Sequence, residues 1–289
     1  MSTPFDIVYH IRSNHDSLSA TEQKVADAIL SDIAFSAAAN IDQIASRAGV
    51  SIATISRFAK SIGCDDIRDL KLKLAQATAV GTRFLTDSNV EESAFYTQIC
   101  SEVESTLRTN LAGFAEADFH AAVNLLNNAR MIYVAGMGGG STMIAEETQF
   151  RLARLGYSIA AYHDPVLLRV LAAAMNSSDV LIILSITGFT PELLDIANLA
   201  GEYGAQLIII TDPASPLAQK ANVLLPIQTQ ETDFIYKPSS SRYGLLLAVD
   251  ILATELALSR RSESKERLRR VKFALDEYRG GNNRLPLGD

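Results

Sequence analysis

The chain has 289 residues, of which 48% are hydrophobic, and its 26 Lys and Arg residues against 33 Asp and Glu residues give a formal net charge of −7. This size and apolar content allow a substantial core and are sufficient for two domains. The net acidity excludes a protein that adheres to nucleic acid through overall positive charge. Asp250 and Glu255 interrupt the longest apolar segment, so we expect a cytoplasmic protein without a membrane partner.

The two cysteines indicate neither a metal site nor a disulfide framework. Cys64 and Cys100 fall on separate predicted helices and lack the spacing of zinc ligands. Paired cysteines are also rare in the reducing cytoplasm. We therefore expect two reduced thiols, no metal and no cofactor.

The segment Ile41–Gly63, IDQIASRAGVSIATISRFAKSIG, has the pattern of a helix, a tight turn and a second helix. Apolar residues recur at helical spacing in both halves, and Gly49 can take the left-handed conformation that the turn requires. Ser51 can cap the second helix. Small, hydroxylated and cationic residues remain on the outer face of this helix: Ala53, Thr54, Ser56, Arg57 and Lys60. Such side chains suit the major groove, so we predict that Ser51 and this face contact double-stranded DNA.

The alternative interpretation is a pair of ordinary amphipathic helices in a bundle, because the helix-turn-helix pattern rests on a few spacings. The flanking sequence favours DNA binding. Ser19 and Glu22 have the spacing of a capping box that begins a preceding helix, and a basic amphipathic helix follows from Ile67. From Ile41 to Ala75 the chain has six basic and four acidic residues, a local net charge of +2. We therefore predict an all-α helix-turn-helix domain over residues 1–80.

The sequence after this domain predicts a linker and a long helix. Residues 80–92, VGTRFLTDSNVEE, are polar and lose periodicity. From Phe95 to Phe114, apolar residues then recur every three or four positions, which indicates a helix that packs on a second domain, with pairing to a partner as the alternative. We assign residues 81–115 to the linker and connecting helix, and residues 116–289 to the second domain.

From Met131 the pattern changes to short apolar runs that alternate with helical segments. Five runs predict buried strands: MIYVAGM, YSIAAYH, DVLIILSIT, QLIIITD and NVLLPIQ. The intervening helices are expected near residues 141–155, 164–174, 190–203 and 215–221. This alternation predicts an α/β domain with a five-stranded parallel sheet flanked by helices, whose ligands bind beyond the carboxyl ends of the strands.

Two strand ends have residues suited to a phosphate. The first strand is followed by GMGGGS, a bare turn in which Gly138, Gly140 and Ser141 let backbone N–H groups and one hydroxyl approach an anion. The third strand ends in SITGFT, where several hydroxyls flank a glycine: Ser185, Thr187, Gly188 and Thr190. Thr190 can also cap the next helix, with Pro191 as its first residue.

The glycine turn taken alone fits two other interpretations, a plain strand-to-helix turn and a dinucleotide-binding fingerprint. The fingerprint requires glycine where this chain has Ser141, and Asp164 is poorly placed to bind a ribose. The hydroxyl cluster after the third strand has no role in dinucleotide binding. The two loops together therefore favour a phosphate site.

These motifs resemble the RpiR family of transcriptional regulators, in which a helix-turn-helix domain is joined to a sugar isomerase (SIS) domain. VSIATISRF resembles the family's recognition helix, GMGGGS its first phosphate loop and LSITGFTPEL its second. The resemblance implies that Ser141 and Ser185 bind phosphate, helped by Thr187, Gly188 and Thr190. The segment TDFIYKPSSSRYGLLLAVDILATELALSRR further resembles the HexR-like branch, whose ligand is 2-keto-3-deoxy-6-phosphogluconate. The segment GCDDI, which follows the predicted recognition helix, departs from the family pattern, because many members have an aromatic residue after this glycine.

The SIS fold also occurs in true isomerases, so a phosphosugar isomerase is the alternative function. It would use Glu231, in the loop after the fifth strand, or His163, after the second, to move a proton. The attached DNA-binding domain favours a regulator, which needs only different ligand affinities in two states. We therefore predict no catalytic residue and assign Glu231 to ligand binding, with Ser240 and Arg242 reaching the ligand's carboxylate or hydroxyls.

The last predicted helix, Arg260–Arg279, mixes Arg and Lys with Glu and Asp, which is typical of a solvated face. A second DNA contact is the alternative for this helix. Because helix-turn-helix modules read two half-sites, we also expect a homodimer or homotetramer. The sequence thus predicts a regulator of carbon metabolism that senses a phosphorylated sugar or sugar acid.

Overall fold

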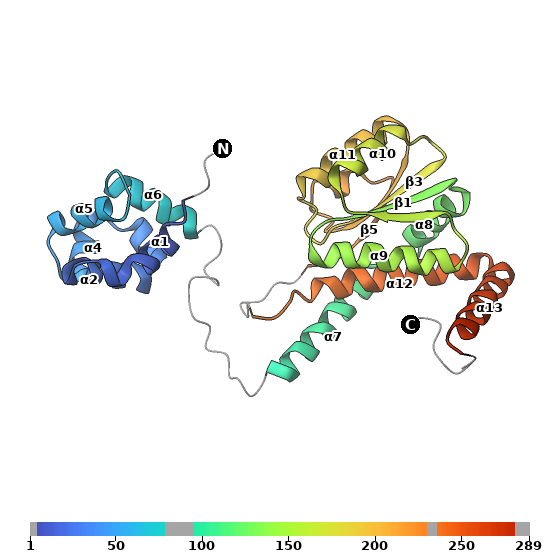
Figure 1. Ribbon diagram of the computed structural model, residues 1–289, viewed down its shortest axis with the longest axis horizontal. Helices are drawn as coiled ribbons and strands as arrows, with labels where there is room; N and C mark the ends of the chain where they lie inside the picture. Colours follow the sequence, from blue (N-terminus) through green and yellow to red (C-terminus); the bar gives the residue numbers. More distant parts are fainter. Residues whose placement is uncertain (1–4, 79–94, 230–235, 281–289) are drawn as a thin grey trace. The chain divides into compact units, whose positions relative to one another are not determined.

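The computed structural model describes residues 5–78, 95–229 and 236–280 (Figure 1). These residues form two compact units, one of residues 5–78 and one of residues 95–229 and 237–280. The helices in these ranges include none with the length and apolar character that spanning a membrane requires.

The first unit is all-helical, as the sequence predicts. Its elements are α1 (Ile7–Asn14), the 3-10 turn η1 (His15–Ser17), α2 (Ala20–Ser31), α3 (Ile33–Ala38), α4 (Ile41–Ala48), α5 (Ile52–Ser61) and α6 (Ile67–Thr78). One apolar core joins these helices and includes Ile29 of α2, Phe58 of α5 and Leu70 of α6. In α6, Leu70 and Leu74 are buried, whereas the side chain of Leu72 is exposed.

Local sequence explains where the helices of this unit begin. Ser19 and Glu22 form the predicted capping box at the start of α2. Asn40 and Gln43 form a second capping box at α4, in which each side chain accepts a hydrogen bond from the other residue's backbone N–H at 2.9 Å. These contacts satisfy N–H groups that a helix cannot bond internally.

The second unit begins with two helices and continues as an alternation of strands and helices. Its elements are α7 (Phe95–Gly113), α8 (Glu116–Asn128), β1 (Met131–Gly136), α9 (Gly139–Arg154), β2 (Ile159–Tyr162), α10 (Pro165–Ala174), β3 (Asp179–Leu184), α11 (Pro191–Glu202), β4 (Gln206–Thr211), the 3-10 turn η3 (Ala218–Lys220), β5 (Val223–Pro226), α12 (Ser241–Ser259) and α13 (Arg261–Tyr278).

The five predicted strands form one parallel sheet in the order β2-β1-β3-β4-β5. β2 lies on one side of β1, whereas β3, β4 and β5 follow on its other side. The strand order therefore reverses between β1 and β3. In the register of the sheet, Gly136 at the end of β1 is paired with Leu184 at the end of β3. Open parallel sheets bind their ligands at such a reversal, beyond the carboxyl ends of the strands.

Helices cover both faces of the sheet, with α9 and α12 on one side and α10 and α11 on the other (Figure 1). Alternate residues of β3 belong to different cores, because successive side chains of a strand point to opposite faces. Ile182 packs with α8, α9 and α12, whereas Ile183 packs with α10 and α11. The last helix, α13, docks through Leu268 on the first of these cores, and Arg267 donates to the Leu155 carbonyl at the end of α9.

One sequence expectation for this unit is wrong. The helix expected over residues 215–221 is a single 3-10 turn, η3, and the Ser215 hydroxyl accepts a hydrogen bond from the N–H of Ala218 at its start. Helix α7 forms and packs on this unit as predicted, but its apolar stripe is only partly buried. Ile99 and Leu111 are exposed, while the polar Thr106 and Asn110 are buried.

Candidate functional sites

The turn between α4 and α5 has the geometry that the sequence predicts. Gly49 follows α4 with φ of 64°, the left-handed region that only glycine enters without strain. Its N–H donates to the Ser46 carbonyl at 3.2 Å, and the N–H of Val50 donates to the Ala45 carbonyl at 3.0 Å. Ser51 then caps α5 by accepting from the N–H of Thr54. The two helices therefore form a closed helix-turn-helix.

The outer face of α5 contains all but one of the predicted DNA contacts. Five side chains are exposed there and at the cap: Ser51, Ala53, Ser56, Arg57 and Lys60. Thr54 is the correction, because only 7% of its surface is exposed and its hydroxyl bonds the Ser51 hydroxyl at 2.9 Å. It lies one turn before Phe58, which belongs to the core, and so supports the cap rather than facing outward.

Sequence reasoning missed Ile52, the first residue of α5, whose side chain is 45% exposed. Isoleucine is usually a core residue, so Ile52 was not predicted to contact DNA. The spacing could have identified it, because Ile52, Ser56 and Lys60 are four residues apart and therefore lie on one face of the helix. An exposed aliphatic group at this place suits the methyl group of thymine.

The connection from α5 to α6 turns Cys64, the residue after Gly63, toward the core. Gly63 has a positive φ of 83°, and the N–H of Cys64 donates to the Ala59 carbonyl at 2.8 Å. Cys64 is thereby turned into the core, where burial raises the pKa of its thiol and keeps it protonated.

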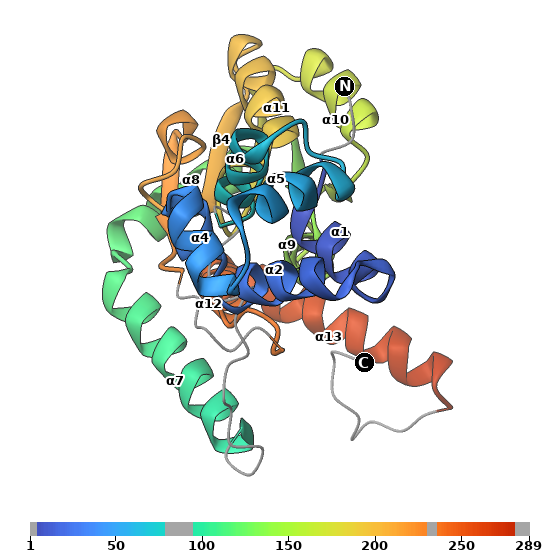
Figure 2. The same ribbon diagram turned by 90° about the vertical axis from the view of Figure 1, so that its left-hand side faces the viewer.

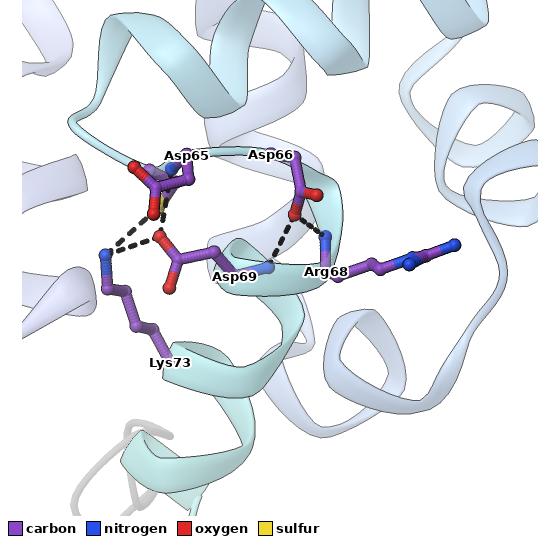
Figure 3. Close-up of polar contacts among 6 residues, drawn as sticks. Asp65, Asp66, Arg68, Asp69 and Lys73 are labelled. Carbon is purple, nitrogen blue, oxygen red and sulfur yellow. Dashed lines mark hydrogen bonds and ion pairs between the residues drawn. The ribbon is translucent and has the colours of Figure 1, made fainter.

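Two aspartates fix the start of α6 beside this turn (Figure 3). Asp66 accepts hydrogen bonds from the N–H groups of Arg68 at 2.7 Å and of Asp69 at 2.9 Å. Asp69 accepts from the N–H of Asp65 at 3.0 Å and from the Lys73 ammonium at 2.7 Å. The hydrogen bond from Lys73 is the main reason that the pKa of Asp69 is lowered.

We expect Asp69→Asn to lower the melting temperature of the chain at pH 7 and to lose this effect in acid. The pKa of Asp69 is lower in the folded state than its unfolded value of about 3.9. Its contribution is therefore fully present above the unfolded pKa and is lost as the pH falls through the folded pKa. Circular dichroism melts at pH 7 and pH 3 measure the difference. The matched control is Asp65→Asn, which leaves this ion pair intact, and an equal deficit at both pH values would contradict the prediction.

The glycine turn and the hydroxyl loop lie next to each other at the strand-order reversal. The turn follows β1 and the loop follows β3, and the last residues of these strands are paired. Gly138 has φ of 83° and precedes α9, so Ser141 is the third residue of that helix and is almost fully buried. The first N–H groups of α9 have no partner within the helix and aim at the reversal, as in phosphate-binding turns.

The loop after β3 is held in shape by its own hydroxyls. Ser185 accepts a hydrogen bond from the N–H of Gly188 at 3.0 Å, which leaves its own O–H able to donate to an anion. Thr187 accepts from the N–H of Phe189 at 3.4 Å. Thr190 occupies the N-cap position of α11 as predicted, but its side chain makes no capping hydrogen bond. The starts of α9 and α11 both carry partial positive charge, which favours an anion between them.

Gly188 is required in this loop for two reasons. Its φ of 68° lies in the left-handed region, and a methyl group on it would lie 2.1 Å from the Ser215 hydroxyl and 2.7 Å from that of Thr211. The loop thus rests directly on the end of β4. The sequence assigned Gly188 to the site but gave no sign of Ser215 or Thr211, because residues beneath a loop have no spacing pattern of their own.

The start of α12 supplies a third wall. A methyl group on Gly140 would lie 3.6 Å from Ile186 and 3.7 Å from the Cβ of Arg242, so three segments meet there. The Arg242 guanidinium donates to the Ser239 carbonyl at 2.7 Å and lies over the Tyr243 ring. Ser240 does not face the site as predicted, because its hydroxyl accepts from Thr106 of α7 in a buried hydrogen bond. Glu231 lies outside the described residues.

His163, the other candidate base, closes the edge of the site beside β1. Its Nδ1 lies 3.2 Å from the Gly136 carbonyl, and its Nε2 lies 3.2 Å from a Glu146 carboxylate oxygen. Both ring nitrogens therefore have partners. Within the ranges that the structure describes, no group of three or more His, Cys, Asp or Glu side chains could hold a metal ion.

A helix-turn-helix unit joined to an α/β unit with this site is the composition of a ligand-sensing transcriptional regulator. Residues 6–81 match the helix-turn-helix domain of the rpiR family, and residues 125–255 match the SIS domain. The chain belongs to the RpiR family of transcriptional regulators.

Similar proteins include two regulators that match almost end to end. The HTH-type transcriptional regulator HexR of Pseudomonas aeruginosa is 33% identical over 273 residues, which cover 93% of this chain and 95% of that protein. HexR of Escherichia coli is 32% identical and the match covers 96% and 97% of the two chains. The bifunctional protein glk of Burkholderia thailandensis is 34% identical over 89% of this chain, which corresponds to 40% of the longer protein.

Solved structures show the same fold. The Vibrio vulnificus NanR protein complexed with ManNAc-6P has a TM-score of 0.59 and 22% identity, with 93% of this chain and 98% of that chain covered. The sugar isomerase domain of an RpiR transcription factor from Sphaerobacter thermophilus has a TM-score of 0.57 and 23% identity, with 62% and 98% covered.

Proposed function

We propose that the chain regulates genes of sugar metabolism by binding an operator through α5 and a phosphorylated sugar or sugar acid through the SIS domain. The observation that supports this is the meeting of the Ser141 turn and the Ser185 loop at the strand-order reversal, between the positive ends of two helices. We propose 2-keto-3-deoxy-6-phosphogluconate as the effector, from the HexR-like sequence of residues 232–261 and the full-length HexR relatives. Its carboxylate is a second anion, which suits a site bordered by Arg242.

A thermal-shift screen of phosphosugars tests this proposal. A ligand that binds the folded chain and not the unfolded chain raises the melting temperature, by an amount equivalent to about 2.7 kcal/mol at a concentration of 100 times its Kd. We expect 2-keto-3-deoxy-6-phosphogluconate to give the largest shift and the unphosphorylated sugar acid to give none. Failure of every phosphorylated compound to shift the transition would overturn the proposal.

The alternative function is a phosphosugar isomerase, and we propose that the chain has no such activity. The HexR regulators match almost the whole chain, which favours a regulator, and both nitrogens of the candidate base His163 already have partners. Incubation with fructose 6-phosphate and related sugars checks this point. Turnover that is proportional to protein concentration and lost in Ser185→Ala would restore the enzyme interpretation.

We further expect the chain to bind DNA as a homodimer or homotetramer. One α5 reads a single half-site, and two copies are needed for the affinity that a net-acidic chain does not obtain from charge alone. The operator should be pseudo-palindromic, with half-sites separated by about one helical turn, roughly 10 base pairs, or a multiple of it. Light scattering of the DNA complex measures the stoichiometry, and one chain per operator would contradict this expectation.

A further inference from the structure

Helix α7 packs against α12 through buried polar residues as well as the half-buried Val103 and Leu107. Its fully buried side chains are those of Thr106 and Asn110, whereas Leu111, on the same helix, is 59% exposed. Both views show α7 extending away from the sheet (Figures 1 and 2). Buried polar groups need partners at defined positions, so these contacts make the docking of α7 specific.

Three residues spaced four positions apart make polar contacts on the packing side of the helix: Glu102, Thr106 and Asn110, here called the polar stripe of α7. Glu102 forms an ion pair with Lys237, in which both side chains are largely buried. Thr106 donates to the hydroxyl of Ser240 at 2.9 Å. Asn110 accepts from the N–H of Gln228 at 2.8 Å and donates to its carbonyl at 3.2 Å, so it bonds both backbone groups of one residue.

The partners of the stripe lie at both ends of the connection from β5 to α12. Gln228 follows β5 by two residues, and Ser240 is the cap of α12. Arg242, whose Cβ approaches Gly140 of the glycine turn, is two residues beyond Ser240. Through Ser240 the stripe bonds the start of α12, which forms the third wall of the proposed effector site, and through Gln228 it bonds the residues that follow β5.

The stripe also fixes one position of α7 along α12. A methyl group on Gly244 would lie 2.8 Å from the Asn110 amide, so the helices approach closely at this point. Movement of α7 by one helical turn would separate all three pairs, and each buried polar group that loses its partner is penalised. Sliding of α7 along α12 is therefore unfavourable, so a displacement of the start of α12 is passed to α7 rather than absorbed between the two helices.

We propose that the polar stripe of α7 transmits effector binding to the helix-turn-helix unit. An effector that contacts Arg242 shifts the start of α12, the stripe follows through Ser240 and Gln228, and α7 moves with it. Helix α7 is the first described element after residues 79–94, which connect it in sequence to α6 of the DNA-binding unit. Glu102, Thr106 and Asn110 are thus positioning residues that touch neither effector nor DNA. This inference rests on the proposed function.

The test measures three quantities in the full-length protein: the Kd for 2-keto-3-deoxy-6-phosphogluconate, the operator Kd without it, and the operator Kd at saturation. The ratio of the two operator values is the response. Thr106→Val keeps the shape of the side chain and removes its hydroxyl, whereas Thr106→Ser keeps the hydroxyl. We expect Thr106→Val to reduce the response about two- to tenfold, the range for loss of one hydrogen bond. Thr106→Ser should respond as the parent does.

Asn110→Ala, which frees both backbone groups of Gln228, should reduce the response further. Thr97→Val, on an exposed face of the same helix, is the matched control and should change nothing. A melting temperature for each variant shows that it is folded.

A full response in both Thr106→Val and Asn110→Ala overturns the inference. So does a loss of effector affinity with an unchanged response at saturation, because the stripe would then only support the pocket. If the parent protein itself binds no phosphosugar, the proposed function fails instead.

Discussion

Ser141→Ala and Ser185→Ala should each abolish or sharply weaken the response to the effector while operator binding without effector persists. Both hydroxyls are almost fully buried at the ends of neighbouring strands, 5% and 3% exposed, where two helix starts favour an anion. A hydrogen bond to a charged group contributes about 1.5–3 kcal/mol, so each loss should weaken effector binding roughly ten- to a hundredfold. Titration calorimetry measures the effector Kd, and fluorescence anisotropy measures operator binding.

The matched control is Ser177→Ala, an exposed serine that precedes β3 and so lies at the opposite end of the strand from Ser185. It should leave both affinities unchanged. Ser185→Ala also removes the acceptor for the Gly188 N–H, so its melting temperature separates loss of a ligand contact from a loosened loop. Effector binding by both mutants as tight as that of the parent protein would reduce the glycine turn and the hydroxyl loop to plain strand-to-helix turns.

Elements whose signal is local were predicted well from the sequence. The turn at Gly49, the capping box at Ser19 and the cap at Thr190 depend on one or two side chains and the backbone beside them. The strands also have a local signal, because a buried parallel strand is a short apolar run. The meeting of the glycine turn and the hydroxyl loop follows from the strand order, which parallel α/β topology makes predictable.

Features that depend on contacts between distant segments were not predicted. Thr54 and Ser240 were placed on functional faces by type and spacing, yet each hydroxyl has a partner that turns it inward. Helix α7 shows the same limit, because apolar periodicity predicted that it packs on the second unit but gave no sign of its buried polar stripe. The partner of Asn110 is Gln228, far along the chain, and helical periodicity contains no information about such a pair.

Arg57→Ala should weaken operator binding without unfolding the protein, by about 1–3 kcal/mol or roughly five- to 150-fold in Kd. The Arg57 side chain lies on the outer face of α5, where its guanidinium donates to the Ala53 carbonyl at 3.4 Å and to the Thr54 hydroxyl at 3.5 Å. Both bonds are long, so little is lost when the group turns to a base edge or a phosphate. Its melting temperature should match that of the parent, because the side chain contributes nothing to the core.

Two further variants show what kind of contact Arg57 makes. Arg12→Ala removes the same charge from the exposed face of α1 and serves as the control for overall electrostatics, with an unchanged operator Kd expected. Arg57→Lys keeps the charge but not the planar group that binds guanine through two hydrogen bonds. A phosphate contact predicts that Arg57→Lys recovers most of the affinity, and a base contact predicts that it stays as weak as alanine and loses discrimination between operator and random DNA. Equal operator affinities for the parent and Arg57→Ala across a range of salt concentrations would mean that the outer face of α5 does not read DNA.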